Sequence, residues 1–431
     1  MSLSARSYFI AILIALIGII GQWSGGGLDV LWRYPAAVLV LGLLYEALRM
    51  RLRTPALSRH IDERGLLGRP LRGNWQLDND QPRSLHLLSL SEFPPGLAGE
   101  RKIYDWQLAA DEQKSQDFTV TPLQLGNLNW RPVYTRSLGR LGLAWWNRKV
   151  VEPGQLRVIP DRLHKYEYQS GTQQTGDRFK RNSGSGYELL GLRDYEQGDP
   201  LRSIDWKATA RTGKHTVRLF TEEQHLELML VIDCGRTSQL QAGALTRLHH
   251  YVNVASRLAQ KAIQQGDHVG LVTFADGPLH WLAPQRGQQG LRRVRHMLEH
   301  TRSLPRESNP LAASMKMRQL VRHRCLAVVF TDIDGSGANE QLLKAMRLLH
   351  PKHLPLLAGL VDEEIEALHK QPAKDWLDPY NAIAARETRH ATELTLLQLR
   401  RMGCQIIEAK PRNLDQQVLT CYDVLRERRK V

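Results

Sequence analysis

Two apolar runs near the start of the chain are its strongest hydrophobic signal. Residues 8–20, YFIAILIALIGII, carry no charge, and residues 35–48, PAAVLVLGLLYEAL, follow a turn-rich connection. Each run is shorter than the ~20 residues that usually span a bilayer, but interfacial aromatics such as Trp23 and Trp32 extend both to a workable length. We therefore predict a two-helix transmembrane hairpin over residues 1–50. No small-residue cleavage site precedes the second run, which disfavours a cleaved signal peptide.

The flanking charges orient this hairpin. Arginines lie on the sides of the two runs that face away from their connection: Arg6, Arg49, Arg51, Arg53 and Arg59. Because positive charge is retained in the cytoplasm, we expect both ends of the hairpin, and everything after residue 50, to face the cytoplasm.

The middle of the chain, residues 51–168, has no long helical period. Short alternating or apolar pieces separated by Pro, Gly and Asn predict strands joined by turns, and hence a sandwich-like, β-rich domain. Its tryptophans, which include Trp106 and Trp130 together with Trp145 and Trp146, are expected to pack in the core or between strands rather than to stack on a ligand.

Residues 226–431 alternate between apolar runs of strand length and amphipathic stretches of helical spacing. This pattern predicts a doubly wound α/β domain with a mostly parallel sheet. We expect strands over 226–233, 268–276, 325–334, 354–361 and 404–409, and helices over 244–265, 290–301, 309–323, 339–351, 391–403 and 414–429. Residues 169–225 are left as a polar, Gly/Ser-rich linker followed by a charged segment.

Acidic and hydroxyl side chains follow two of the predicted strands. Asp233 ends the first strand, and Thr331, Asp332 and Asp334 follow the strand CLAVVF. Doubly wound sheets bind ligands at the carboxyl ends of their strands, and oxygen ligands suit a hard divalent cation such as Mg²⁺. Capping of the following helices explains the same residues equally well. No G-x-G-x-x-G follows the first strand, so a dinucleotide site is not expected.

Net charge and cysteines add little to this picture. A net charge of +15 suits an anionic partner, but the arginines are dispersed and aromatics are not interleaved with them, which makes nucleic acid the weakest candidate. Part of the excess is expected to lie against anionic lipid. The four cysteines form no CxxC pair and predict reduced, packed thiols.

The segment DYEQGDPLRSIDWKATAR, residues 194–211, has the densest mixture of charges. Its aspartates (Asp194, Asp199 and Asp205) could be catalytic carboxylates, but neighbouring arginines tend to hold them ionised, and no Ser/His/Asp order or H-E-x-x-H supports a hydrolase. The favoured interpretation is an ion-pair clasp between domains that buries Ile204 and Trp206. A surface for docking a partner is the other interpretation.

This segment resembles the signature of the family DUF58, whose members carry a domain of the von Willebrand factor A fold. The matching residues are Tyr195, Gly198, Asp199, Arg202, Ile204, Asp205, Trp206, Ala208, Ala210 and Arg211. The resemblance covers nearly the whole chain. It implies a protein of the bacterial inner (plasma) membrane without established enzymatic activity, which acts with an AAA+ ATPase of the MoxR type in the assembly or maturation of client proteins.

The resemblance also implies a metal site, which this sequence matches only in part. Asp233 and Thr237 match the first motif, where Gly235 lacks the expected hydroxyl, and Ser308 and Asp332 match the other two loops. Such a degenerate site could still bind Mg²⁺ through extra waters. Alternatively, Arg236 could place its guanidinium in the pocket and exclude the metal.

We therefore expect a membrane-tethered protein-interaction module without catalytic activity. The alternative is a membrane-associated hydrolase that uses the aspartates of residues 194–205. A small-molecule substrate is not expected.

Overall fold

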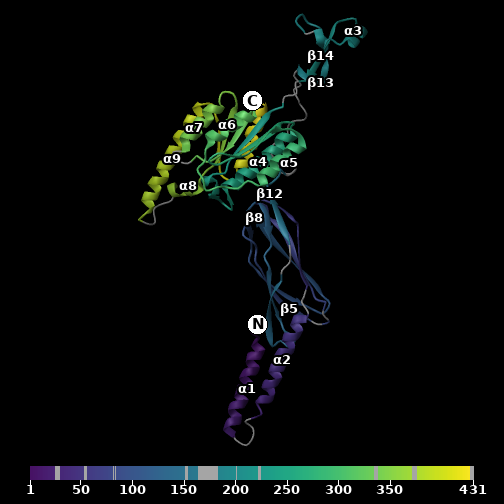
Figure 1. The fold of residues 1–431 in the computed structure, drawn as a ribbon, viewed down its shortest axis with the longest axis vertical. Helices are drawn as coiled ribbons and strands as arrows, with labels where there is room; N and C mark the ends of the chain where they lie inside the picture. The colour runs from purple at the N-terminus through teal and green to yellow at the C-terminus, as the bar shows by residue number, and fades with distance from the viewer. Residues whose placement is uncertain are drawn as a thin grey trace. The chain divides into compact units, whose positions relative to one another are not determined.

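The structure is a computed structural model that describes residues 1–24, 30–52, 56–80, 82, 84–150, 154–163, 183–199, 201–221, 225–333, 338–370 and 376–427. Contacts divide the chain into two units, Met1–Asp161 and Arg162–Val431. The first unit holds the N-terminal helices and a sheet-rich part, and the second holds a mixed α/β domain (Figure 1). The predicted bounds 1–50, 51–168, 169–225 and 226–431 stay predictions.

Two helices, α1 (Ala5–Ser24) and α2 (Arg33–Leu52), lie side by side at the N-terminus (Figure 1). Among the described helices, α1 is long and apolar enough to cross a membrane, by length and composition. The second predicted span is not confirmed, because Glu46 and two arginines interrupt the apolar part of α2. A single possible membrane helix is therefore what the structure supports.

Glu46 anchors α2 to the turn 139–144 of the sheet-rich part. Its carboxylate is 1% exposed and accepts three backbone N–H groups at 2.6–3.3 Å, from Leu141, Leu143 and Ala144. The hydroxyls of Ser4 and Ser7 donate to carbonyl oxygens of the same turn. A Cβ at Gly139 would lie 2.2 Å from a carboxylate oxygen of Glu46, so the close approach requires glycine. Glu46 in the second apolar run therefore has a structural role, because its hydrogen bonds offset the cost of burying the carboxylate.

The sheet-rich part contains two larger antiparallel sheets, in the strand orders β1-β11-β10-β5-β7 and β2-β4-β8-β6, and a smaller sheet, β3-β12-β9. Their strands are β1 (Ser2–Leu3), β2 (Ala56–Ile61), β3 (Arg64–Leu66), β4 (Leu71–Asp78), β5 (Leu85–Ser91), β6 (Leu97–Gly99), β7 (Ile103–Leu108), β8 (Gln113–Pro122), β9 (Gly126–Asn129), β10 (Val133–Leu138), β11 (Ala144–Val150) and β12 (Gln155–Ile159).

Both larger sheets contribute alternate side chains to one core. Trp106 on β7 is fully buried and donates its indole N–H to Ser89 at 2.8 Å, while Trp75 on β4 packs in the same core. Trp130 is half-buried against this core, with the guanidinium of Arg59 4.3 Å from its ring centre. The prediction of a sheet-rich middle is therefore confirmed, and Trp106 packs as predicted.

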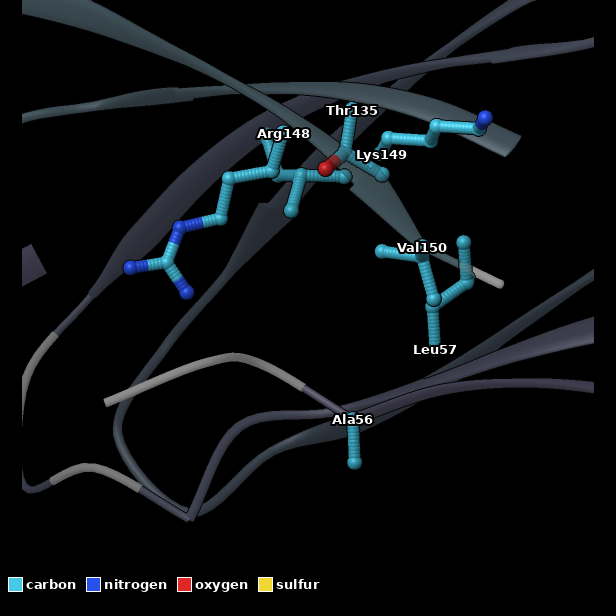
Figure 2. Close-up of a pocket in the computed structure, with 7 residues that line it drawn as sticks. Ala56, Leu57, Thr135, Arg148, Lys149 and Val150 are labelled. Atoms are coloured by element: carbon cyan, nitrogen blue, oxygen red, sulfur yellow. The ribbon is translucent and has the colours of Figure 1, made fainter. Parts of the chain in front are cut away.

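A pocket of about 560 Å³ lies where β2 faces β10 and β11 (Figure 2). It is lined by Ala56, Leu57, Leu87, Thr135, Arg148, Lys149 and Val150. No carboxylate, histidine or thiol is among these lining residues. The described part of its lining therefore offers no side chain that commonly ligates a metal ion.

The mixed α/β domain has a six-stranded sheet in the order β19-β18-β15-β20-β21-β22. All its neighbours pair in parallel except β18 and β19. The strands are β15 (Glu227–Asp233), β18 (His268–Phe274), β19 (Pro278–Gln285), β20 (Leu326–Phe330), β21 (Leu354–Leu360) and β22 (Gln405–Ala409). The five predicted strands are present, and the antiparallel edge strand β19 was not predicted.

Helices cover both faces of this sheet. One face carries α4 (Arg247–Gln264), α5 (Gly287–Glu299) and α10 (Leu414–Glu427), and the other carries α6 (Pro310–Leu320), α7 (Ala338–Leu349) and α9 (Asp378–Arg401), with α8 (Glu363–Lys370) beside α9 (Figure 1). Cys234, Cys325 and Cys404 are buried free thiols, as predicted.

Candidate functional site

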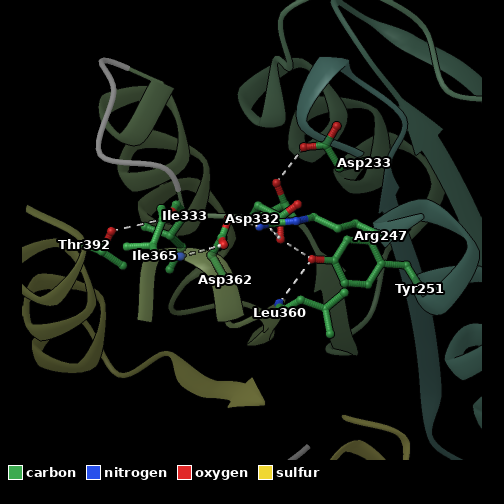
Figure 3. Close-up of polar contacts among 10 residues, drawn as sticks. Asp233, Arg247, Tyr251, Asp332, Ile333, Leu360, Asp362, Ile365 and Thr392 are labelled. Carbon is green, nitrogen blue, oxygen red and sulfur yellow. Dashed lines mark hydrogen bonds and ion pairs between the residues drawn. The ribbon is translucent and has the colours of Figure 1, made fainter. Parts of the chain in front are cut away.

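The strongest candidate site lies at the carboxyl ends of β15 and β20. These strands pair in parallel at the centre of the sheet, where the strand order reverses direction. Such a switch point is where doubly wound sheets bind ligands. Asp233, at the end of β15, accepts the hydroxyl of Thr331, which follows β20. Asp332, the next residue, lies near Asp233 (Figure 3). Asp334 lies outside the described residues.

Asp233 is buried and accepts hydrogen bonds at both carboxylate oxygens. Its Oδ1 accepts the backbone N–H of Gly235 at 2.8 Å and the hydroxyl of Ser308 at 2.5 Å. Its Oδ2 accepts the hydroxyl of Thr331 at 2.6 Å. Donors from three separate loops therefore hold this carboxylate in place.

Ser308 fills the space of the hydroxyl that the sequence lacks at position 235. A Cβ built on Gly235 would lie 2.1 Å from the Ser308 hydroxyl oxygen, so a serine at 235 and this rotamer of Ser308 exclude each other. Thr237 lies in the short helix η3 (Arg236–Gln239) and is half-buried. Among the described hydrogen bonds, those on Asp233 do not include the Thr237 hydroxyl.

Asp332 is held by a guanidinium that the sequence did not reveal. Arg247, the first residue of α4, places one terminal nitrogen 3.0 Å from Asp332 and the other 2.6 Å from Asp362. The hydroxyl of Tyr251, one turn further along α4, also donates to Asp332 and accepts the backbone N–H of Leu360 at 3.2 Å. Figure 3 shows both α4 side chains converging on Asp332.

Burial dominates the electrostatics of this pair. The side chain of Asp332 is 3% exposed, and burial raises its pKa to about 6, although the charge of Arg247 acts in the opposite direction. The nearby charge of Asp233 raises the pKa further. Burial and Asp332 also raise the pKa of Tyr251 well above its ordinary value, so its hydroxyl stays a donor.

These residues do not fit a resident Mg²⁺ ion as they are arranged. A hard divalent cation needs carboxylate oxygens and hydroxyls that face it as acceptors. Here Asp332 is paired with a guanidinium, and the hydroxyls of Ser308 and Thr331 point their protons at Asp233. Among the described residues, no cluster of three or more His, Cys, Asp or Glu side chains could hold a metal.

Arg236, the alternative occupant that the sequence suggested for the pocket, does not enter it. Its guanidinium pairs with Glu307 at 3.0 Å, and both side chains are exposed. Arg247 takes that role instead. The one signal in the sequence was its position at the start of a helix, where the helix dipole disfavours a cation unless carboxylates face it.

The signature segment is a second cluster of carboxylates, on β13 (Ser183–Asp194), the short helix η2 (Leu201–Ser203), α3 (Trp206–Thr212) and β14 (Thr216–Thr221). Asp205 caps α3 by accepting the backbone N–H groups of Lys207 and Ala208 at 3.0 and 3.1 Å. Its second oxygen accepts from Arg218 on β14 at 2.9 Å. The hydrogen bond from Arg218, followed by the backbone bonds, lowers the pKa of Asp205 to about 2.

Asp199 has a similar structural role. It accepts the backbone N–H of Glu196 at 3.0 Å and the guanidinium of Arg193 at 2.6 Å, and these contacts lower its pKa. Gly198 adopts φ +116°, a conformation that favours glycine, which explains the glycine–aspartate pair of the signature. The hydrogen bonds described for both aspartates all come from residues 193–218.

The hydrophobic residues of this segment divide into two sets. Ile204 is buried at 8% exposure, as predicted, and pairs with Val217 on β14. The predicted burial of Trp206 is wrong, because its side chain is 65% exposed. Leu201 and Leu192 are also exposed, at 71% and 49%. Tyr195 is half-buried, Arg211 is exposed, and the side chain of Arg202 lies outside the described residues.

One family profile matches the signature segment together with much of the α/β domain. Residues 191–390 match the profile described as "Protein of unknown function DUF58". The chain is similar to the uncharacterized protein Rv1480 of Mycobacterium tuberculosis, with 25% identity over 43% of this chain and 59% of the relative. It is also similar to the uncharacterized protein YeaD of Bacillus subtilis, with 21% identity over 48% of each. The chain thus spans about half to three-fifths of the length of these relatives.

Solved structures match a smaller part of the chain. The CARDB domain of a Pyrococcus furiosus protein in complex with di-metal ions matches 22% of this chain and 89% of its own, with 15% identity and a TM-score of 0.14. The cupredoxin domain of amoB from Nitrosocaldus yellowstonii matches 21% and 61%, with 12% identity and a TM-score of 0.12.

Proposed function

We propose, with the DUF58 match of residues 191–390 as the premise, that this protein is a membrane-tethered protein-interaction module. Its α/β domain has the von Willebrand factor A fold, and it acts with an AAA+ ATPase of the MoxR type in the assembly or maturation of client proteins. The module has no catalytic activity of its own. The observation that carries the proposal is the exposure of Trp206 within the signature segment.

The exposed side chains of this segment suit a docking surface. Tryptophan and arginine are the side chains that most often dominate binding energy at protein interfaces. Trp206 and Leu201 are both more than half exposed, although Ile204 between them is buried. Three exposed cations lie in the same stretch of chain and favour an acidic surface on the partner: Lys207, Arg211 and Lys214. We assign this docking surface to residues 201–214.

The aspartates of the same segment support binding rather than hydrolysis. A general acid needs a raised pKa, whereas the contacts of Asp199 and Asp205 lower theirs. Both carboxylates are occupied by backbone N–H groups and an arginine. This arrangement disfavours the alternative of a membrane-associated hydrolase.

The N-terminal helices supply the tether in this proposal. The exposed apolar side chains of α1 face outward along its length, as lipid contact requires. We propose that α1 and α2 insert together in a bacterial inner membrane, with residues after 50 on the cytoplasmic side, because arginines flank the runs away from their connection.

Capture of the ATPase tests this proposal. The protein in detergent is immobilised and incubated with an AAA+ ATPase of the MoxR type from the same organism. Trp206→Ala is expected to weaken capture by about 2 kcal/mol, roughly 30-fold, as for a central aromatic anchor. Trp376→Ala is the matched control, since Trp376 is 73% exposed but lies outside the signature segment. Absence of capture by the unmodified protein, or equal losses in both variants, contradicts the proposal.

A further inference from the structure

The site at the ends of β15 and β20 contains its own cation. Arg247 is 7% exposed, and its two terminal nitrogens contact Asp332 and Asp362, which follow two adjacent strands. A buried charge is stable only when it is paired and hydrogen-bonded. The positive charge therefore occupies the space between the carboxylates of the two loops.

An arginine suits this position for a specific reason. Its planar fork contacts two carboxylates at once, which the single ammonium of a lysine does less well. The position at the start of α4 is unfavourable for a cation in a helix dipole, so the pairing with Asp332 and Asp362 has to offset that cost. Tyr251 completes the set by donating to Asp332 from the same face of α4.

The other carboxylate of the site is held by uncharged donors. Asp233 accepts hydrogen bonds from the backbone N–H of Gly235 and from the hydroxyls of Ser308 and Thr331. The hydroxyl of Thr331, which directly precedes Asp332, donates to Asp233 at 2.6 Å, so the two carboxylates belong to one site. This combination has two carboxylates and two hydroxyls, as a cation site requires, and a guanidinium beside them.

We infer that the Arg247 guanidinium takes the place of a divalent cation at this site, so that the domain neither binds nor requires one. A corollary is that the domain recognises its partner without a divalent cation; this corollary rests on the proposed function, whereas the inference about cation binding does not.

Equilibrium dialysis of the full-length protein in detergent against Mn²⁺ tests the inference. The unmodified protein is expected to bind no more Mn²⁺ than the Asp233→Ala variant. Arg247→Ser is expected to gain one saturable Mn²⁺ per chain, and the gain is lost again when Asp233→Ala is added. Arg247→Lys, which keeps the charge, is expected to gain none.

Arg257→Ser is the matched control. Arg257 lies on the same helix and pairs with Asp415 on α10 at 2.5 Å, not with the carboxylates of the candidate site, so its removal is expected to add no Mn²⁺ site. If Arg247→Ser does not fold, Arg247→Gln removes the charge while keeping a hydrogen-bond donor, and the same gain is expected.

Two results overturn the inference. The first is an Mn²⁺ site in the unmodified protein that Asp233→Ala abolishes. The second is folded Arg247→Ser or Arg247→Gln protein without any gain of Mn²⁺. Failure of the ATPase to be captured, with these Mn²⁺ results as expected, overturns the proposed function and leaves the cation inference standing.

Discussion

The two carboxylate clusters of this protein lie in opposite electrostatic environments. Asp332 at the strand ends is buried, and burial raises its pKa to about 6. Asp205 in the signature segment is partly exposed, and its arginine and backbone donors lower its pKa to about 2. The signature segment, which has the denser charge in the sequence, therefore holds its aspartate in the ordinary ionised form, whereas the strand ends hold an aspartate whose pKa is raised. Burial and the number of donors, rather than charge density, decide what an aspartate does.

Removal of the built-in cation is expected to give the largest effect. Arg247→Met leaves Asp332 buried without its ionic partner, which is expected to destabilise the α/β domain by about 3–5 kcal/mol. The melting temperature of this domain, measured by calorimetry on the full chain in detergent, reports the change. Arg236→Met is the control, because its exposed pair with Glu307 is worth about 1 kcal/mol or less. Equal shifts in melting temperature for the two variants contradict the assignment of Arg247 as the ionic partner of buried Asp332.

A side chain at position 235 is expected to give the next largest effect. Gly235→Ser places a Cβ 2.1 Å from the Ser308 hydroxyl and is expected to cost about 1–3 kcal/mol through overpacking. Adding Ser308→Gly removes the contact at 2.1 Å but leaves the Arg306 carbonyl oxygen at 3.0 Å and the Asp233 carboxylate at 3.1 Å. The double variant is therefore expected to recover part of the loss, a coupling that a double-mutant cycle measures. Gly277→Ser is the control, since a Cβ there meets nothing within 4 Å. If the losses of the two single variants simply add in the double variant, Ser308 does not occupy the volume that a side chain at position 235 would fill.

The sequence predicted the central sheet well and its edge poorly. Fully buried strands such as β15 and β21 are continuous apolar runs, so their positions follow from hydrophobicity alone. The edge strand β19 contains two prolines and mixes exposed with half-buried residues, so it has no such run. The first half of α9 escaped prediction for a similar reason, because its buried residues, apart from Ala385, lie in its last two turns.

The candidate sites show the same limit at the level of single residues. Parallel pairing of two strands was enough to predict that Asp233 and Asp332 lie close together. The burial of Arg247 depends on carboxylates that follow β20 and β21, far away in the sequence, so its position at the start of a helix was not enough to predict it. Trp206 was predicted to be buried because it is apolar. Which of Ile204 and Trp206 is buried depends instead on the packing of β14, which pairs with Ile204 and leaves Trp206 exposed.

The pH dependence of stability is expected to differ in sign between the two clusters. Because the folded-state pKa of Asp332 is raised from 3.8 to about 6, its contribution favours folding most below pH 3.8 and is lost as the pH rises through 6. Asp205 contributes stability above pH 3.8 that is lost as the pH falls toward 2.

Calorimetry of the α/β domain from about pH 7 to about pH 4 tests the first half of this expectation. The Asp332→Asn variant is expected to show a weaker gain on acidification than the unmodified protein, whereas Asp205→Asn is expected to follow the unmodified protein throughout this range. Identical profiles for all three proteins contradict the assignment of the raised pKa to Asp332.

Changes at the cap of α3 are expected to have the smallest effect on the chain as a whole. Asp205→Asn keeps an oxygen that accepts the N–H groups of Lys207 and Ala208 but loses the charge that faces Arg218, whereas Asp205→Ala loses both. Amide hydrogen exchange of α3 is therefore expected to rise slightly in the asparagine variant and more in the alanine variant. The melting temperature of the α/β domain is expected to stay unchanged in both. Equal exchange in the two variants shows that the ion pair, and not the cap, holds the segment; a shift in melting temperature shows that the signature segment also supports the rest of the domain.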